Sequence, residues 1–144
     1  MAEDRYRLAP LREVRERSEV ARRGNLSTAI GDARITEATV AAAAARVEQA
    51  RIALHAATLS GAPSRAPRLA TALVVEEGYR ARLRAALAVA RDEELRARLA
   101  HDERSTEVEA ARARLARARA DREVIERHFA AWRDAQRKRR EDRE

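Results

Sequence analysis

The chain has 144 residues, of which 38% are charged, 3% are aromatic and none is cysteine, and its formal net charge is +7. Large apolar side chains are too few to fill a compact globular core, because alanine contributes little area to bury. The lack of cysteine excludes a disulfide framework and thiolate chemistry. The longest uncharged apolar run, residues 38–45, is far shorter than the roughly 20 residues of a membrane-spanning helix. We therefore expect a cytoplasmic protein without direct membrane insertion, whose basic balance favours acidic partners.

The first predicted element is a helix over residues 4–58. Apolar residues recur in it at alternating steps of four and three, which is the repeat of a helix that packs along one seam. The predicted seam consists of Leu26, Ile30, Ala33, Glu37, Val40, Ala44, Val47, Arg51 and Leu54. Nearer the start, a stripe in a shifted frame consists of Leu8, Leu11, Val14, Ser18 and Ala21. We place the shift between Gly24 and Gly31, because glycine weakens a helix.

The predicted loop covers residues 59–67 and reads LSGAPSRAP. One glycine and two prolines in so short a stretch are typical of a connection between helices. Elsewhere the chain has only three glycines and one proline, so the composition leaves room for few and very long elements.

The second predicted helix covers residues 68–140. Its seam starts at Leu69 and continues through Leu87, Val108 and Ile125 to Gln136 without a break in register. Two long helices joined by a short loop pack as an antiparallel pair. The predicted fold is therefore all-α: two long helices that form one antiparallel coiled-coil hairpin, as a single domain over residues 1–144.

Folding the chain about the middle of the predicted loop pairs residues whose numbers sum to about 127. Leu54 then faces Leu73, Leu26 lies near His101, and residues 3–6 lie near residues 121–124. On this pairing, helix one ends before it reaches the last section of helix two.

The predicted functional surface lies on that last section. Ile125, Phe129 and Trp132 continue the seam beyond its pairing, and exposed apolar groups at helical spacing mark a contact with a partner. A basic patch follows them on the same section of helix, and it consists of Arg133, Arg137, Arg139 and Arg140. We predict that these seven residues bind a partner. The alternative is that Tyr6 and Leu8 fold back over Phe129 and Trp132 as a hydrophobic cap.

No motif in the sequence points to catalysis. There is no Gly-rich phosphate loop and no HExxH spacing, and the three histidines lie far apart along the chain. We expect a protein that is not an enzyme and that uses no cofactor and no metal.

The basic stretch ARARLARARA, residues 111–120, offers a face for nucleic acid. No aromatic residue is interleaved in it to stack on bases. We favour ion pairs with Glu13, Glu16 and Glu19 of helix one, and expect no nucleic acid as partner.

The two ends of the chain resemble a known family. The stretch YRLAPLREVRERSEVA, residues 6–21, resembles the opening of the type III secretion stalk proteins, the YscO/SctO family of injectisomes and its flagellar counterpart FliJ. The likeness rests on Tyr6, Leu8, Leu11, Val14, Arg15, Glu16 and Arg17. The ending RDAQRKRREDRE after Trp132 is similar to the C-terminus of the family. Gly24 and Gly31 depart from the uninterrupted first helix of the family.

This resemblance implies a function. Members of the family are cytoplasmic antiparallel coiled coils that engage the hexameric export ATPase and the cytoplasmic domain of the export gate, and some also bind export chaperones. None is itself an ATPase. The resemblance implies that the paired ends of the helices enter the ATPase pore at the base of a secretion apparatus, that the loop points to the gate, and that the basic patch meets an acidic pore lining. The alternatives are a coiled-coil scaffold or adaptor of another assembly, and a basic nucleic-acid-binding helical hairpin.

Overall fold

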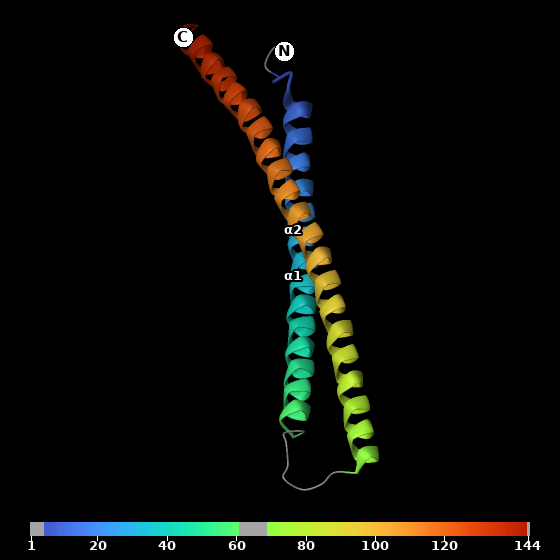
Figure 1. The fold of residues 1–144 in the computed structure, drawn as a ribbon. Coiled ribbons are helices and arrows are strands. Elements are labelled where there is room, and N and C mark those ends of the chain that lie inside the picture. The colour runs from blue at the N-terminus through green and yellow to red at the C-terminus, as the bar shows by residue number, and fades with distance from the viewer. Residues whose placement is uncertain (1–4, 61–68, 144) are drawn as a thin grey trace. The chain divides into compact units, whose positions relative to one another are not determined.

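The computed structural model describes residues 5–60 and 69–143, and these form two long helices (Figure 1). Helix α1 covers Ala9–Ser60, and helix α2 covers Ala70–Glu141. Residues of α1 contact residues of α2 in reverse chain order, so the predicted all-α antiparallel hairpin is confirmed. Residues 59 and 60 of the predicted loop belong to α1, and the rest of that loop lies outside the described residues.

The start of helix α1 accommodates a proline. Pro10 lies in the first turn, where a missing backbone N–H breaks no helical hydrogen bond. Just before it, the amide of Ala9 donates to the carbonyl of Tyr6 at 3.2 Å, which turns the preceding segment into the helix.

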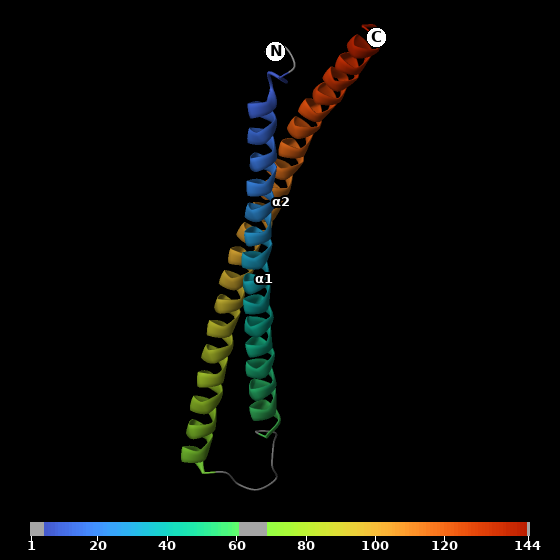
Figure 2. The same cartoon turned by 180° about the vertical axis from the view of Figure 1, so that it is seen from behind.

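The chain forms two compact units, each built from a part of both helices. Unit 1 comprises Met1–Gly31 and Ser105–Glu144, and unit 2 comprises Asp32–Arg104. The colour bar of Figure 1 locates them: unit 1 combines the blue part of α1 with the orange and red part of α2, and Figure 2 gives the view from behind.

The inward positions of α1 follow one frame along the whole helix, without the predicted shift. They are buried or half-buried with the exception of Arg22. The series is Leu8, Arg12, Arg15, Glu19, Arg22, Leu26, Ala29, Ala33, Thr36, Val40, Ala43, Val47, Ala50, Leu54 and Ala57. The prediction was wrong at five positions, which are exposed: Leu11, Val14, Ala21, Glu37 and Arg51. Charged residues occupy the seam near the first three of these because acidic and basic groups of α2 lie opposite, so hydrophobicity alone points to the wrong face.

The seam of α2 agrees with the prediction over most of its length. Its buried members all fall on the predicted series of steps of four and three that runs from Leu69 to Gln136, and they are Leu87, Ala90, Val108, Ala111, Leu115, Ala118 and Ile125. The predicted members Leu69 and Leu73, at the start of α2, are instead exposed. Small alanines at the contact let two helices approach closely.

The register between the helices differs from the predicted one. Thr36 contacts His101 and Ala57 contacts Arg80, so the numbers of facing residues sum to 137 and not to about 127. At this sum the residue level with Ser60 is Glu77, seven residues into α2. The first two turns of α2 therefore extend past the end of α1, which explains why Leu69 and Leu73 are exposed.

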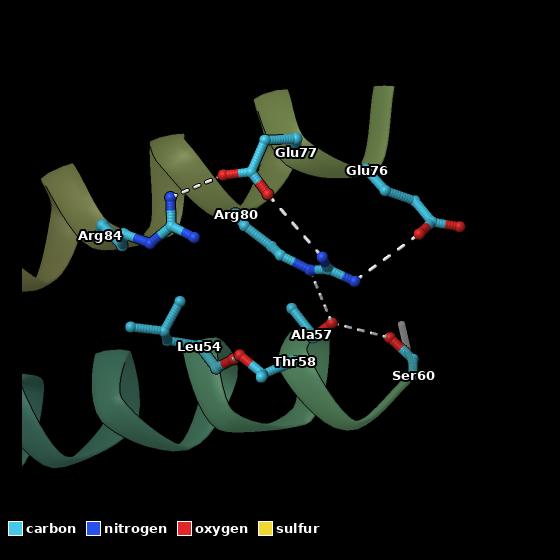
Figure 3. Close-up of polar contacts among 8 residues, drawn as sticks. All are labelled: Leu54, Ala57, Thr58, Ser60, Glu76, Glu77, Arg80 and Arg84. Carbon is cyan, nitrogen blue, oxygen red and sulfur yellow. Dashed lines mark hydrogen bonds and ion pairs between the residues drawn. The ribbon is translucent and has the colours of Figure 1, made fainter. Parts of the chain in front are cut away.

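In unit 2, α2 caps the end of α1 through Arg80 (Figure 3). The last carbonyls of a helix lack partners within it, and α1 has no basic residue in its last turn. The Nε of Arg80 donates to the carbonyl of Ala57 at 3.3 Å, and the hydroxyl of Ser60 donates to the same oxygen at 3.1 Å. Arg80 also pairs with Glu76 at 3.6 Å and with Glu77 at 3.7 Å. A cation from α2 thus meets the negative end of the dipole of α1.

Candidate partner-binding surface

An aromatic cluster lies in unit 1, between the segment before α1 and the last part of α2. Tyr6 is 6% exposed and forms the centre of the cluster. The centroid of its ring lies 5.0 Å from that of Phe129, in an edge-on arrangement, and 5.3 Å from that of Trp132. Its hydroxyl lies 2.9 Å from Nδ1 of His128, within hydrogen-bond distance. Such ring pairs stabilise a contact by about 0.5–1.5 kcal/mol beyond the area that they bury.

The ring of Phe129 is close to another aromatic ring and to two arginine side chains. Its ring stacks on Trp132 at 5.9 Å, and the guanidinium of Arg12 lies 4.5 Å from its centroid. The guanidinium of Arg133 lies 5.9 Å from the same centroid. Both cations are within the distance at which the negative face of an aromatic ring attracts them.

These contacts correct the expectation that Phe129 and Trp132 lie beyond the reach of their own chain. The alternative, a cap formed by the start of the chain, is what the structure has, with Tyr6 in the main role. The cause is the shift in register: the predicted pairing placed Tyr6 near residues 121–124, whereas it contacts His128, Phe129 and Trp132. The proposed role of Phe129 and Trp132 in binding a partner stays a prediction.

Next to the cluster, a row of ion pairs joins the helices of unit 1. Arg12 donates to Glu126 at 2.7 Å and Arg15 donates to Asp121 at 2.9 Å. Arg12 and Arg15 occupy the seam positions that were predicted for their apolar neighbours Leu11 and Val14. These seam positions could have been predicted from the sequence if charged residues had been allowed in the seam. The positions from Leu8 to Ala57 then follow steps of four and three residues without a break.

Glu19 is the most enclosed member of this row, with a side chain 7% exposed. Its carboxylate accepts hydrogen bonds from Arg122 at 2.9 Å and from Arg23 at 3.0 Å, and Arg119 lies 3.6 Å away. The hydrogen bond from Arg122 lowers the pKa of Glu19 below its ordinary value, against the opposing effect of burial. The pKa of Glu126 is lowered in the same way, chiefly by its hydrogen bond from Arg12.

The predicted binding residues divide into two groups by exposure. Ile125 is buried in the seam, and Phe129 and Trp132 are half-buried. Exposed side chains form the basic patch of Arg133, Arg137, Arg139 and Arg140. Of these, Arg137 pairs with Asp134 of its own helix at 3.3 Å.

A shallow groove of about 270 Å³ connects the two groups. Tyr6 and Trp132 lie along it, and the exposed Arg5, Arg7 and Arg139 border it. Because Arg5 and Arg7 come from the segment before α1, the groove joins basic residues of both ends of the chain. Arg5 and Arg7 were not part of the predicted patch. An apolar side chain next to carboxylates is the ligand chemistry that such a groove fits.

The basic stretch at residues 111–120 is in part neutralised by its own chain. Arg112 donates to Glu109 at 2.6 Å and Arg114 donates to Glu107 at 2.9 Å, both within α2. Of the three glutamates of α1 that were expected to face the stretch, Glu19 contacts Arg119. These ion pairs break up the continuous basic face that a phosphate backbone would need.

Among residues 5–60 and 69–143, no group of three or more His, Asp or Glu side chains is placed to hold a metal ion. Neither described helix has a stretch long and apolar enough to cross a membrane. Comparison of the chain with protein-family models, with curated proteins and with solved structures finds no match.

Proposed function

We propose that the protein is the stalk of a type III secretion system, which couples a hexameric export ATPase to the export gate and takes no part in catalysis itself. The observation that carries the proposal is the set of side chains at the end of unit 1 where Tyr6 and Trp132 lie. Aromatic rings, two of them half-buried, lie there beside exposed arginines that come from both ends of the chain. The resemblance of residues 6–21 and of the charged ending to the YscO/SctO and FliJ proteins supports the same function.

The chemistry of this end suits an acidic protein partner. Arginine and large aromatic residues contribute most to binding energy at protein interfaces. The charges of Arg133, Arg139 and Arg140 would steer the chain toward the acidic lining of an ATPase pore. The ring of Trp132 would then fill an apolar pocket of that lining.

The start of α2, in unit 2, supports a second contact. The start of α2 extends past α1 and leaves Leu69, Leu73, Val74 and Val75 between 49% and 77% exposed. An apolar group of this kind marks an interaction site. In the proposed function it meets the cytoplasmic domain of the export gate, and export chaperones would bind elsewhere on the hairpin.

The test is co-purification of the full chain with a hexameric secretion ATPase from the same organism. Reversing the patch with Arg133→Glu, Arg139→Glu and Arg140→Glu should weaken binding roughly a hundredfold, because a patch of interface arginines contributes at least about 2–3 kcal/mol. The matched control reverses three exposed arginines of α2 in unit 2, Arg82, Arg91 and Arg96. Equal binding of the two triple variants would contradict the assignment of the patch, and no complex with the unaltered chain would contradict the function.

A further inference from the structure

Helix α1 carries a second stripe of uncharged residues on its outward face in unit 2. The stripe repeats at steps of three and four, as the inward seam does, and all of its members are exposed. It consists of Ile35, Ala38, Ala42, Ala45, Gln49, Ile52, Ala56 and Leu59. The three large members, Ile35, Ile52 and Leu59, are 67%, 56% and 61% exposed. We call this set the outer stripe.

The composition of the outer stripe differs from that of an ordinary solvated face. The charged residues between positions 35 and 59 are Glu37, Arg46, Glu48 and Arg51, and none of them lies on the stripe. Nothing within the described part of unit 2 covers them. A helix with two seams of the same repeat can pack against two neighbours, one on each side. In this hairpin α2 occupies the first side.

The charges that flank the outer stripe are complementary to those of a second copy, although Glu48 also pairs with Arg51 of its own helix at 2.8 Å and Arg46 lies 3.9 Å from Glu93 of α2. One edge of the stripe carries Arg34 and Glu48, separated by two heptads, and the other edge carries Asp32 and Arg46, also separated by two heptads. Each edge therefore presents one cation and one anion at the same spacing. A second copy of α1, turned end for end, presents the opposite sign to each of them.

The register of such a pair follows from coiled-coil geometry. In an antiparallel pair the numbers of facing seam residues have a constant sum, and the flanking pairs on the two edges sum to two more and two less. With a sum of 80, Ala38 faces Ala42 and Ile35 faces Ala45 of the second copy. The flanking sums are then 82 and 78, which pair Arg34 with Glu48 and Asp32 with Arg46. Two-fold symmetry makes four such ion pairs.

Other registers lose this complementarity. Moving one copy by a heptad, to a sum of 73 or 87, leaves none of the four charges opposite another charge of the set. Moving it by two heptads, to a sum of 94, sets Glu48 against Glu48 and Arg46 against Arg46. A parallel pair in register sets Arg34 beside Thr39, without an ion pair.

We propose that the protein self-associates as an antiparallel pair of α1 helices centred near residue 40 of each copy. In this pair the first half of the outer stripe, Ile35 to Ala45, packs on itself, and the second half, Gln49 to Leu59, packs along residues 21–31 of the second copy. At the centre of the contact, small side chains of one copy pack on small side chains of the other, and ion pairs lie along both edges. Alanines favour close approach and bury little area, so the association is weak and reversible. The surface is separate from the basic patch, so the inference does not depend on the proposed function.

The test is sedimentation equilibrium of the full chain over a wide range of concentration. The unaltered chain should show a monomer–dimer equilibrium. Arg34→Glu sets glutamate against Glu48 twice in the dimer and should raise the dissociation constant about tenfold, because two attractive charge pairs become repulsive. The double variant Arg34→Glu with Glu48→Arg exchanges the two signs and should return the dissociation constant to within about threefold of its original value.

The control is Arg91→Glu, the same charge change at an exposed position of α2 in unit 2. It should leave the dissociation constant unchanged, and helix content measured by circular dichroism should be the same in all variants. A chain that is monomeric at every concentration overturns the proposal. So does a dimer whose strength does not recover in the double variant.

Cross-linking tests the register directly, because the chain contains no cysteine of its own. Ala41 faces Ala41 of the second copy at the predicted register, so Ala41→Cys should form covalent dimers with a short bismaleimide. Ala88→Cys places a thiol on the outward face of α2 and should not. Efficient cross-linking at Ala88 and not at Ala41 would assign the contact to α2 and overturn the proposal.

Discussion

The rings of Tyr6 and Trp132 lie with their centroids 5.3 Å apart, so the segment before α1 and the last part of α2 are joined by aromatic contact. The two residues are 126 positions apart in the sequence, and the same contact includes Phe129, whose centroid lies 5.0 Å from that of Tyr6. Tyr6 is the group that shields the proposed partner-binding aromatics. The stability of this end of unit 1 should therefore depend on it.

Replacement of Tyr6 by alanine should lower the free energy of unfolding by roughly 3 kcal/mol, at the lower end of the range for a buried aromatic residue. Tyr6→Phe retains the ring and removes only the hydrogen bond with His128, so it should cost about 1 kcal/mol. Urea unfolding followed by circular dichroism measures both. Trp132 is the single tryptophan, and its emission should shift to the red in Tyr6→Ala and stay in place in Tyr6→Phe. Equal losses in the two variants would show that the ring contributes nothing.

The carboxylates of the ion-pair row should make stability depend on pH. The folded-state pKa values of Glu19 and Glu126 lie below their ordinary values because Arg122 and Arg12 donate to them. Between these lowered pKa values and the ordinary carboxyl pKa, the unfolded chain therefore binds more protons than the folded chain. The free energy of unfolding rises with pH through this range. The stabilisation is fully present above the ordinary carboxyl pKa and is lost as the pH falls through the lowered folded-state values.

Glu19→Gln should flatten this dependence. The expected result is a lower melting temperature at neutral pH and a smaller difference between neutral and acidic pH than in the unaltered chain. Glu13→Gln is the matched control, because Glu13 is exposed and pairs only with Arg17 of its own helix among the described residues. A Glu19→Gln variant whose melting temperature falls as steeply with acid as that of the unaltered chain would contradict the role of Glu19.

The fold could be predicted from the sequence because its determinants are local and repeated. The steps of four and three from Leu87 to Ile125 and the single cluster of Gly and Pro define two helices and one connection. The register could not be predicted, because it depends on where each helix ends relative to the other. The ten-residue error came from assuming that the two helices start level at the loop.

Only the part of the candidate surface that does not depend on the register between the helices could be predicted from the sequence. The basic patch follows from composition, since arginines near the end of a helix are exposed wherever the partner helix lies. The covering of Phe129 by Tyr6 depends on the register, and so it was left as an alternative. The seam positions of Arg12, Arg15 and Glu19 were missed because a purely apolar criterion prefers Leu11 and Val14, one residue away.

The close approach of the helices in unit 1 should make its small seam residues intolerant of larger ones. Ala111 is 2% exposed, so Ala111→Leu must separate the helices or distort neighbouring side chains, and should lower the free energy of unfolding by about 1–3 kcal/mol. Ala113 lies on the exposed face of the same turn region, and Ala113→Leu should change stability by no more than about 0.5 kcal/mol. Urea unfolding of the pair gives the comparison. Similar losses at the two positions would mean that the seam is not closely packed at Ala111.

Gly24 offers a test of whether the glycines of α1 serve the fold. Helix α1 passes through Gly24 without interruption, its φ angle is not positive, and a Cβ built there would meet no atom within 4 Å. Neither backbone geometry nor space therefore requires glycine. Gly24→Ala should raise the free energy of unfolding by about 0.5–1 kcal/mol, because alanine restricts the unfolded chain and favours the helix.

Ala21→Gly is the reciprocal control for this prediction, since Ala21 is exposed on the same helix less than one turn before Gly24. It should lower the free energy of unfolding by a similar amount. Thermal melting of the two variants beside the unaltered chain should place them on opposite sides of it. A Gly24→Ala variant that melts lower would show that glycine is needed at this position for a contact that the isolated chain does not contain. A binding partner seated on this face of α1 would be the first candidate, and melting in its presence would identify it.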